Sequence, residues 1–297
     1  MRLLIAAAFL ATTTPALAEP LSYGFTIGSL NAVALKDGSL DQPNDGKAVF
    51  QGDPKAIAAK LAAAGQRTDV VQFSIQPLLV HAGKRVLLFD TGAGAALGPG
   101  AGKLPLALRE AGVDPARITD IFITHSHSDH IGGLLKPDGG LAFPNAAIHI
   151  SRPEWEWLST LGPARAAQFG IPRYEELIAA MRPKVETFAP GAVLIPGLVR
   201  AYTVKGHTPG HSAYVITSGK ASLLDIGDSA HNFVVSVQMP AILNGFDQDQ
   251  PLAARSRQVL LAYLAMTHQR IYAGHFPFPG LGTIAKEGSG YIWKPER

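Results

Sequence analysis

Residues 124–133 carry three histidines and one aspartate whose spacing could bind metal ions. A short apolar run precedes them and is typical of a buried strand. Side chains alternate along an extended segment, so His125 and His127 should point the same way. Asp129 and His130 follow where the chain turns toward a helix, and they can face a second point nearby. Because neutral imidazole and carboxylate suit zinc and its first-row neighbours, the segment predicts a site for two metal ions.

Metal binding has to be weighed against an ordinary structural role for these residues. A single histidine usually lies at the surface or is satisfied within the core. A cluster of histidines with an aspartate between His125 and His130, directly after an apolar run, is rare outside metal sites. The pattern therefore favours metal ligands over structural residues.

The motif resembles the HxHxDH signature of the metallo-β-lactamase-fold hydrolases. Residues 206–211, GHTPGH, match a second motif of that family, in which the first histidine, His207, is a ligand. Asp90 begins a DTG segment that resembles a third motif, where the aspartate supports the metal-binding loop from outside the ligand set. In isolation, an aspartate at a strand end is as often a turn residue. We interpret His211 and Asp225 as structural residues.

The resemblance implies a complete set of metal ligands in this chain. His275 follows a predicted strand, as the family's last histidine does. Asp228 lies past a strand end, and one carboxylate can bridge two cations. The first ion would be held by His125, His127 and His207, the second by Asp129, His130 and His275, with Asp228 between them. Zinc is the default for these ligands, and manganese, iron or cobalt would fit as well.

Two later segments are similar to the methyl parathion hydrolase branch of the same family. They are residues 227–231 (GDSAH) and residues 276–282 (FPFPGLG), and the similarity extends over most of the chain after residue 85. The family resemblance implies an α/β fold, a four-layer αββα sandwich in which helices cover two mixed sheets. It also implies one hydrolase domain, residues 19–297, with its site at the edge where strand-end loops from both halves meet.

Residue patterns predict several of the elements around these motifs. Residues 70–80 are typical of one apolar strand. Ser151 and Glu154 have the Ser-x-x-Glu spacing of a helix capping box. Residues 251–267 predict the longest helix. Its apolar side would consist of Leu252, Val259, Leu260, Tyr263 and Leu264.

Composition excludes several classes of protein. Lys and Arg number 26 and Asp and Glu 23, so the net charge is only +3 and nucleic-acid binding is not expected. Hydrophobic residues make up 47% of the chain, too many for a disordered protein. The lack of cysteine excludes disulfides and thiolate ligands. The expected partner is a small-molecule substrate, and a homodimer is left open.

Residues 1–18 have the pattern of a secretory signal peptide. Arg2 supplies the positive charge, residues 3–11 are apolar, and Ala16-Leu17-Ala18 is a small-x-small cleavage site. The mature chain would begin near Glu19. An ordinary buried N-terminal helix is the alternative. The pattern predicts a periplasmic or secreted protein with no stable membrane insertion after the signal is removed.

The ligand set predicts a metal-dependent hydrolase. A water shared by two divalent cations loses a proton near neutral pH and becomes a hydroxide nucleophile. Asp129 is expected to orient this hydroxide and to pass a proton to the leaving group, besides acting as a ligand. Two other classes are left open: a non-catalytic exported metal-binding protein, and another reaction on the same fold, such as oxidation at a di-iron site.

The choice of substrate depends on the walls of the pocket. The candidates are Leu97, Trp157, His231, Phe233 and Phe276, although aromatic residues such as these pack in the core more often than they contact a substrate. Leu97 stands where we expect an aromatic residue in phosphotriesterase members. Apolar walls suit uncharged substrates, so we predict hydrolysis of neutral esters or lactones. Organophosphate triesters would be slower substrates, and β-lactamase-type amide hydrolysis is the alternative.

Overall fold

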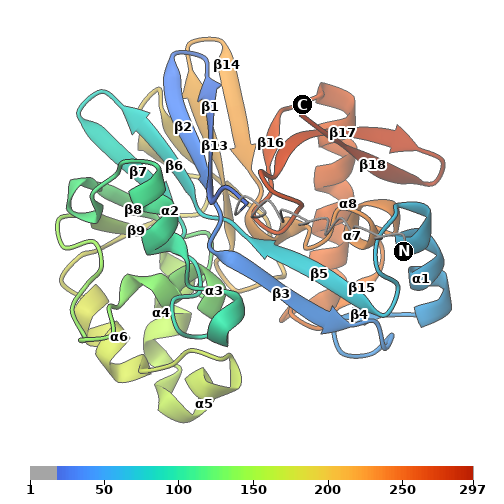
Figure 1. Cartoon of the computed structure of the whole chain (residues 1–297), viewed down its shortest axis with the longest axis horizontal. Coiled ribbons are helices and arrows are strands. Elements are labelled where there is room, and N and C mark those ends of the chain that lie inside the picture. The colour runs from blue at the N-terminus through green and yellow to red at the C-terminus, as the bar shows by residue number, and fades with distance from the viewer. Residues whose placement is uncertain (1–18, 297) are drawn as a thin grey trace, which may run out of the picture.

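Two seven-stranded mixed sheets form the centre of the molecule, and helices cover their outer faces (Figure 1). The computed structural model describes residues 19–296, so the predicted signal peptide lies outside the described residues. The first sheet is covered by α2 (Leu104–Glu110), α4 (Arg152–Thr160) and α6 (Tyr174–Met181), and the second by α8 (Gln250–Thr267). The four-layer αββα sandwich expected from the sequence is confirmed.

The first sheet changes from antiparallel to parallel at its middle. In spatial order its strands are β1 (Ser22–Ile27), β2 (Leu30–Leu35), β6 (Leu78–Ala82), β7 (Arg85–Phe89), β8 (Asp120–Phe122), β9 (Ala147–Ser151) and β10 (Val185–Phe188). Pairing is antiparallel up to β7 and parallel from β7 to β10. Parallel neighbours need crossover connections. These crossovers carry α2, α4 and α6 on the outer face, and the loops at the strand ends remain free to build a site.

The second sheet is antiparallel except for one central pair. Its strands, in spatial order, are β11 (Val193–Ile195), β12 (Val199–Thr203), β13 (Ser212–Ser218), β14 (Ala221–Asp225), β16 (Ile271–Tyr272), β17 (Leu281–Glu287) and β18 (Gly290–Pro295). The parallel pair is β14 with β16, and α8 lies in the crossover between them.

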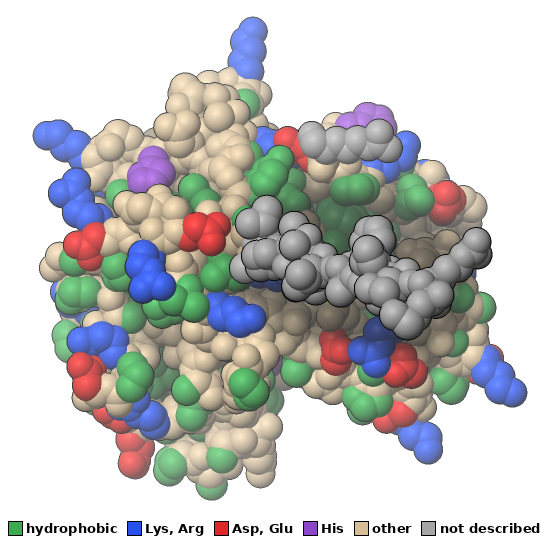
Figure 2. Space-filling model, viewed as in Figure 1, with side chains coloured by type: hydrophobic (Ala, Val, Ile, Leu, Met, Phe, Trp, Pro, Cys, Tyr) green, Lys and Arg blue, Asp and Glu red, His purple; other side chains and the backbone are tan. Residues whose placement is uncertain are grey.

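Smaller elements lie between and beside the sheets. They are α1 (Pro54–Ala63), α3 (Ser128–Ile131), α5 (Gly162–Gln168), α7 (Val235–Gln238), β3 (Gly38–Pro43), β4 (Phe50–Gln51), β5 (Val70–Ile75) and β15 (Leu243–Asn244). The β3–β5 ribbon extends from the first sheet toward α1 (Figure 1). Within residues 19–296, no helix combines the length and apolarity that a membrane span needs. On the face in Figure 2, basic and acidic side chains are interspersed, as the nearly balanced composition leads one to expect.

Aromatic packing between the sheets anchors the strand ends that precede the histidine motif. Phe89 and Phe122 close β7 and β8, and their rings stack with centroids 5.0 Å apart. Tyr214 of the second sheet packs on both rings, and its hydroxyl donates to the carbonyl of Ile123 at 2.6 Å. Burying each aromatic side chain stabilises the fold by about 1.5–3 kcal/mol. Buried aromatic rings from both sheets therefore support the loop that begins at Thr124.

The prediction of one strand over residues 70–80 is wrong, because the structure divides this segment into β5 and β6. β5 pairs with β3, whereas β6 lies between β2 and β7 in the first sheet. The break falls at Gln76 and Pro77, where proline has no N–H to continue a ladder. The Gln76 amide donates to the carbonyls of Gly274 and Phe276, which flank His275. The interruption therefore joins the first sheet to the loop that carries the last histidine.

The long helix begins one residue earlier than predicted, and its predicted apolar side is only partly buried. Val259 is 67% exposed, whereas Leu260 and Leu264 pack inward. Arg257 is also buried and donates to the carbonyls of Pro240 and Ile242. A charged residue can occupy the inner face because backbone oxygens satisfy it, and apolar periodicity does not reveal such an arrangement.

Candidate metal centre

Strand ends from both sheets deliver the polar residues to one edge of the sandwich. β8, β12, β14 and β16 each end a few residues before a candidate ligand: His125, His207, Asp228 and His275, in that order. The short helix α3 follows His127 and turns Asp129 and His130 toward the same edge. Residues far apart in the sequence therefore meet because the two sheets pack face to face.

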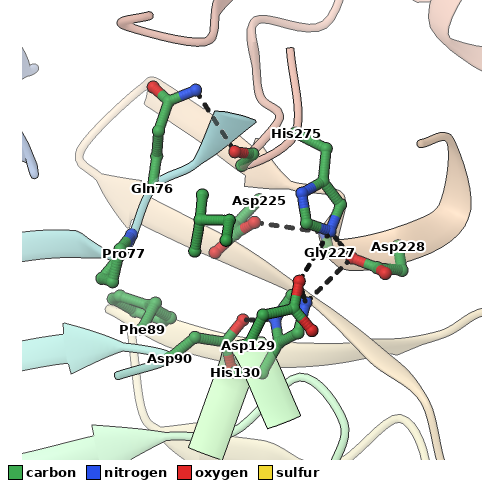
Figure 3. A pocket seen from close by; sticks show the side chains of 12 residues that line it. Gln76, Pro77, Phe89, Asp90, Asp129, His130, Asp225, Gly227, Asp228 and His275 are labelled. Atoms are coloured by element: carbon green, nitrogen blue, oxygen red, sulfur yellow. Dashed lines mark hydrogen bonds and ion pairs between the residues drawn. The ribbon is translucent and has the colours of Figure 1, made fainter. Parts of the chain in front are cut away.

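The seven residues expected from the sequence gather into two groups that could each hold a cation. In each group, one possible ligand atom per residue lies within 4.8 Å of the others. The groups are His125, His127, His207 and Asp228, and Asp129, His130 and His275. Figure 3 shows the side chains of the second group converging with Asp228.

Asp228 lies between the two groups and presents one carboxylate oxygen to each. Its Oδ1 is 3.3 Å from His130 Nε2 and 3.1 Å from His275 Nε2. Its Oδ2 is 3.6 Å from His125 Nε2 and 3.3 Å from His207 Nε2. This is the placement that a carboxylate bridging two cations requires.

The contacts within the cluster fit a pair of divalent cations. His207 Nε2 lies 3.0 Å from both His125 Nε2 and His127 Nδ1, so three imidazole nitrogens meet at one point. Among the described residues, His130 Nε2 and Asp228 Oδ1 are buried without a hydrogen-bond partner. Unpaired buried polar atoms are costly, and a cation would satisfy them. The donor set of imidazoles and carboxylates is the one that zinc and related metals prefer.

Hydrogen bonds on the outer ring nitrogens orient several of these histidines. His130 Nδ1 donates to Asp90 at 2.7 Å, and His275 Nδ1 donates to the Ser74 carbonyl at 2.6 Å. Asp90 also accepts from the amide and hydroxyl of Thr124. Such bonds fix the ring and leave Nε2 pointing at the centre. Asp90 thus lies outside the ligand groups and braces the histidine loop, as the sequence predicted.

The pKa values of the histidines are shifted in different directions in the two groups. Burial lowers the pKa of His125 and His207 well below the usual value, so both rings are neutral at pH 7, as metal binding needs. Burial also acts to lower the pKa of His275, but the Asp228 and Asp129 carboxylates raise it to about 9. Burial would raise the pKa of Asp228, but the surrounding histidines hold it well below its usual range.

His211 and Asp225 have the structural roles expected of them. His211 Nδ1 donates to the Val204 carbonyl, and its Nε2 accepts from the amide of Asp228. Asp225 accepts from the amide of Gly227, and burial raises its pKa to about 8. Both residues therefore shape the turn that presents Asp228.

Asp247 contacts the candidate site, and the sequence did not reveal it. It accepts from His207 Nδ1 at 2.8 Å, and its other oxygen lies 3.8 Å from the buried guanidinium of Arg257. No local motif marks Asp247, because its role depends on tertiary contacts alone. A carboxylate behind a metal-binding histidine orients the ring and raises its basicity.

We expect the Asp247→Ala variant to bind zinc about 10–100-fold more weakly, because His207 loses its hydrogen-bond acceptor. Chelator competition would measure the affinity. Asp247→Asn retains an acceptor oxygen and should lie closer to the wild-type affinity. The exposed Asp138, replaced by Asn, serves as a control. Equal affinities for Asp247→Ala and the wild-type protein would contradict this role.

A cavity of about 390 Å³ opens onto the metal cluster. Its floor includes His127, Asp129, Asp228 and His275. Its apolar walls are Leu40, Phe73, Ile75, Leu97, Phe169 and Phe246. Of the residues predicted to line the pocket, Leu97 and His231 do so.

The other three predicted pocket residues lie elsewhere. Phe276 is fully buried in the core, where it packs against Trp293. Phe233 packs on the same two rings and lines a different cavity, on another side of His275. Trp157 stands behind the wall, with its ring against Phe169. Phe233 and Phe276 lie close to ligands in sequence, but neighbouring side chains diverge once a strand or helix begins.

His231 faces the cluster without belonging to either of these two groups. It is almost fully buried, and its Nε2 lies 3.4 Å from Asp228 Oδ2. Neither ring nitrogen has a hydrogen-bond partner among residues 19–296. His231 is also one of the residues that line the 390 Å³ cavity.

Comparisons with known proteins place this geometry in context. Residues 72–275 match the model of the metallo-beta-lactamase superfamily. The structure is similar to AidC, a dizinc quorum-quenching lactonase in complex with the product N-hexanoyl-L-homoserine, at 29% identity and a TM-score of 0.86, over 94% of this chain and 99% of that one. It is also similar to AbOPH, a hydrolase in the beta-lactamase superfamily, at 28% identity and a TM-score of 0.84, over 94% and 98%.

A more distant likeness concerns the fold alone. A probable metal-dependent hydrolase from Staphylococcus aureus has a TM-score of 0.71 at 19% identity, over 92% of this chain and all of that one. No curated protein matches the chain.

Proposed function

Because the chain belongs to the metallo-beta-lactamase superfamily and is a metal-dependent hydrolase, we propose that it hydrolyses neutral lactones or esters with an apolar chain. The observation that carries this proposal is the cavity above the cluster, whose walls are aliphatic and aromatic. No lysine or arginine is among its described lining residues. An uncharged substrate therefore fits better than a β-lactam, whose carboxylate would find no cation there.

The proposed metal ligands are the seven residues that the structure gathers into two groups. Asp228 is assigned as the bridge because its two oxygens face different groups. The dizinc centre of AidC supports two zinc ions as the cofactor. When bound, such ions polarise a substrate carbonyl and lower the pKa of water.

The protein's own residues have distinct tasks in this proposal. Asp129 is the more accessible carboxylate of the cluster, with its side chain 18% exposed against 5% for Asp228. It can therefore hold a proton and deliver it to the leaving oxygen of a substrate in the cavity. His231 can donate a hydrogen bond to the substrate from the neighbouring wall. Phe73, Phe169 and the other apolar walls exclude water and hold the chain of the substrate.

Within the superfamily we place the chain near the methyl parathion hydrolase branch. The likeness to AbOPH supports a hydrolase of this general kind. Leu97 gives that wall of the cavity an aliphatic surface, and an aryl leaving group would lose the ring stacking that an aromatic residue could offer. Phosphotriester turnover is therefore proposed as a slower side activity. Export through residues 1–18, with a mature domain from residue 19, remains part of the proposal.

The test compares kcat/KM for four substrates on one zinc-loaded preparation. The substrates are N-hexanoyl-homoserine lactone, an aryl ester, methyl parathion and a cephalosporin. We expect the lactone or the ester to lead and methyl parathion to be slower. A cephalosporin that led by tenfold, about 1.4 kcal/mol of transition-state stabilisation, would overturn this interpretation of the cavity.

A further inference from the structure

Glu154, in the first turn of α4, does not have the capping role that its spacing from Ser151 predicted. Ser151 makes no side-chain cap bond, and its hydroxyl donates instead to the carbonyl of Gly210 at 2.6 Å. Glu154 is completely buried. Among the described residues no lysine or arginine pairs with it. A buried carboxylate without a cation is costly unless hydrogen bonds satisfy it, so its contacts need an explanation.

Four donors surround the Glu154 carboxylate, two on each oxygen. Oε1 accepts from the amide of Ser126 at 2.8 Å and from its hydroxyl at 2.5 Å. Oε2 accepts from the hydroxyl of Thr208 at 2.7 Å and from the amide of Gly210 at 2.8 Å. An ionised carboxylate only accepts, and here each oxygen receives two donors.

The two pairs of donors come from the two loops that carry the first group of histidines. Ser126 stands between His125 and His127, and Thr208 directly follows His207. These loops belong to different sheets, yet His207 Nε2 lies 3.0 Å from a nitrogen of each of the other two rings. The Glu154 side chain therefore links the two loops beside the point where the three imidazole rings meet.

Glycine at position 210 allows this close approach. A Cβ there would lie 2.2 Å from Ser151 Oγ and 2.3 Å from the Glu154 backbone nitrogen. The start of α4 is thus packed directly on the loop that follows His207. All hydrogen bonds of the Glu154 carboxylate within residues 19–296 go to Ser126, Thr208 and Gly210, and none goes to the second group of Asp129, His130 and His275.

We infer that Glu154 is a positioning residue that sets the separation of the two histidine loops and so pre-forms the first metal site. The inference rests on the proposed assignment of His125, His127 and His207 as ligands. Without the carboxylate, the two loops are no longer hydrogen-bonded to the same side chain. Metal binding must then bring the three rings together, and this ordering reduces the free energy of metal binding. The second site should be affected far less, since its ligands have their own braces at Asp90 and Ser74.

The test measures stepwise zinc affinity by chelator competition in Glu154→Gln and Glu154→Ala. A glutamine amide presents two N–H donors toward a site already filled with donors, so at least one backbone amide loses its acceptor. We expect one of the two binding steps to weaken about 10–100-fold, the same step that Asp247→Ala weakens, while the other stays within about threefold. Excess zinc should restore kcat. Glu156→Gln, an exposed change on the same helix, is the control and should bind as the wild type does.

Two milder variants keep the inference testable if the Glu154 variants do not fold. Thr208→Val and Ser126→Ala each remove a side-chain donor without changing the charge, and each should weaken the same step to a smaller extent. Unchanged affinity at both steps in folded Glu154→Gln would overturn the inference, as would an equal loss at both steps. A wild-type protein that binds no zinc would instead overturn the proposed function.

Discussion

The Asp129→Ala variant is expected to lose about 10²–10⁴-fold in kcat, the usual contribution of a positioned acid–base group. Asp129 lies 3.5 Å from both His130 Nε2 and His275 Nε2 and is the cluster carboxylate most open to the cavity. Its removal deprives the leaving group of its proton source. KM should change much less, because the apolar walls that bind the substrate are untouched.

The measurement is steady-state kinetics on zinc-saturated protein, with bound metal determined on the same sample. Asp129 is also a proposed ligand, so zinc content has to be restored before the rates are compared. Asp138→Ala, at an exposed loop carboxylate, should behave as the wild type does. A near-native rate in Asp129→Ala with two zinc ions bound would show that the proton takes another route.

Removing the metal is expected to abolish hydrolysis and to destabilise the fold together. Without cations, the unpaired His130 Nε2 and Asp228 Oδ1 and the close ring nitrogens of His125 and His207 remain buried. A ligand present at 1,000 times its Kd stabilises the folded state by about 4 kcal/mol per site, and this contribution disappears on chelation.

Urea unfolding and substrate turnover, each with and without a chelator, measure both effects. The same chelator saturated with zinc is the control and should leave rate and stability unchanged. Full activity after removal of all metal would refute the proposed role of the cluster. Lost activity with an unchanged free energy of unfolding would show that metal binding is not coupled to the stability of this region.

The sequence was most informative where the chemistry is local. His125, His127, Asp129 and His130 lie within one short segment, so their types and spacing could be interpreted together. The apolar pattern before them predicted the preceding strand. The αββα layering was expected only from the family resemblance. The structure brings these residues together with His207, Asp228 and His275, as expected.

The parts that could not be predicted depend on contacts between distant segments. Asp247 supports a histidine forty positions away in the chain, and Glu154 reaches two loops at once. Glu154 was assigned to a helix cap because its local spacing fits one. Phe169 lines the cavity at the end of α5, and no pattern around it distinguishes it from a core residue. Tertiary packing decides such cases.

The origin of the ligands in both sheets has a consequence for the order of folding. His125 follows β8 and His275 follows β16, so their approach depends on contacts of long sequence separation, which are slow to form. The partly synthesised chain would carry the first motif long before its partners exist. That motif alone offers an incomplete set of ligands, so tight loading of metal should wait until the two sheets have docked. Tight zinc binding would then indicate that folding is complete. A chain arrested before the sheets dock should bind zinc with lower affinity.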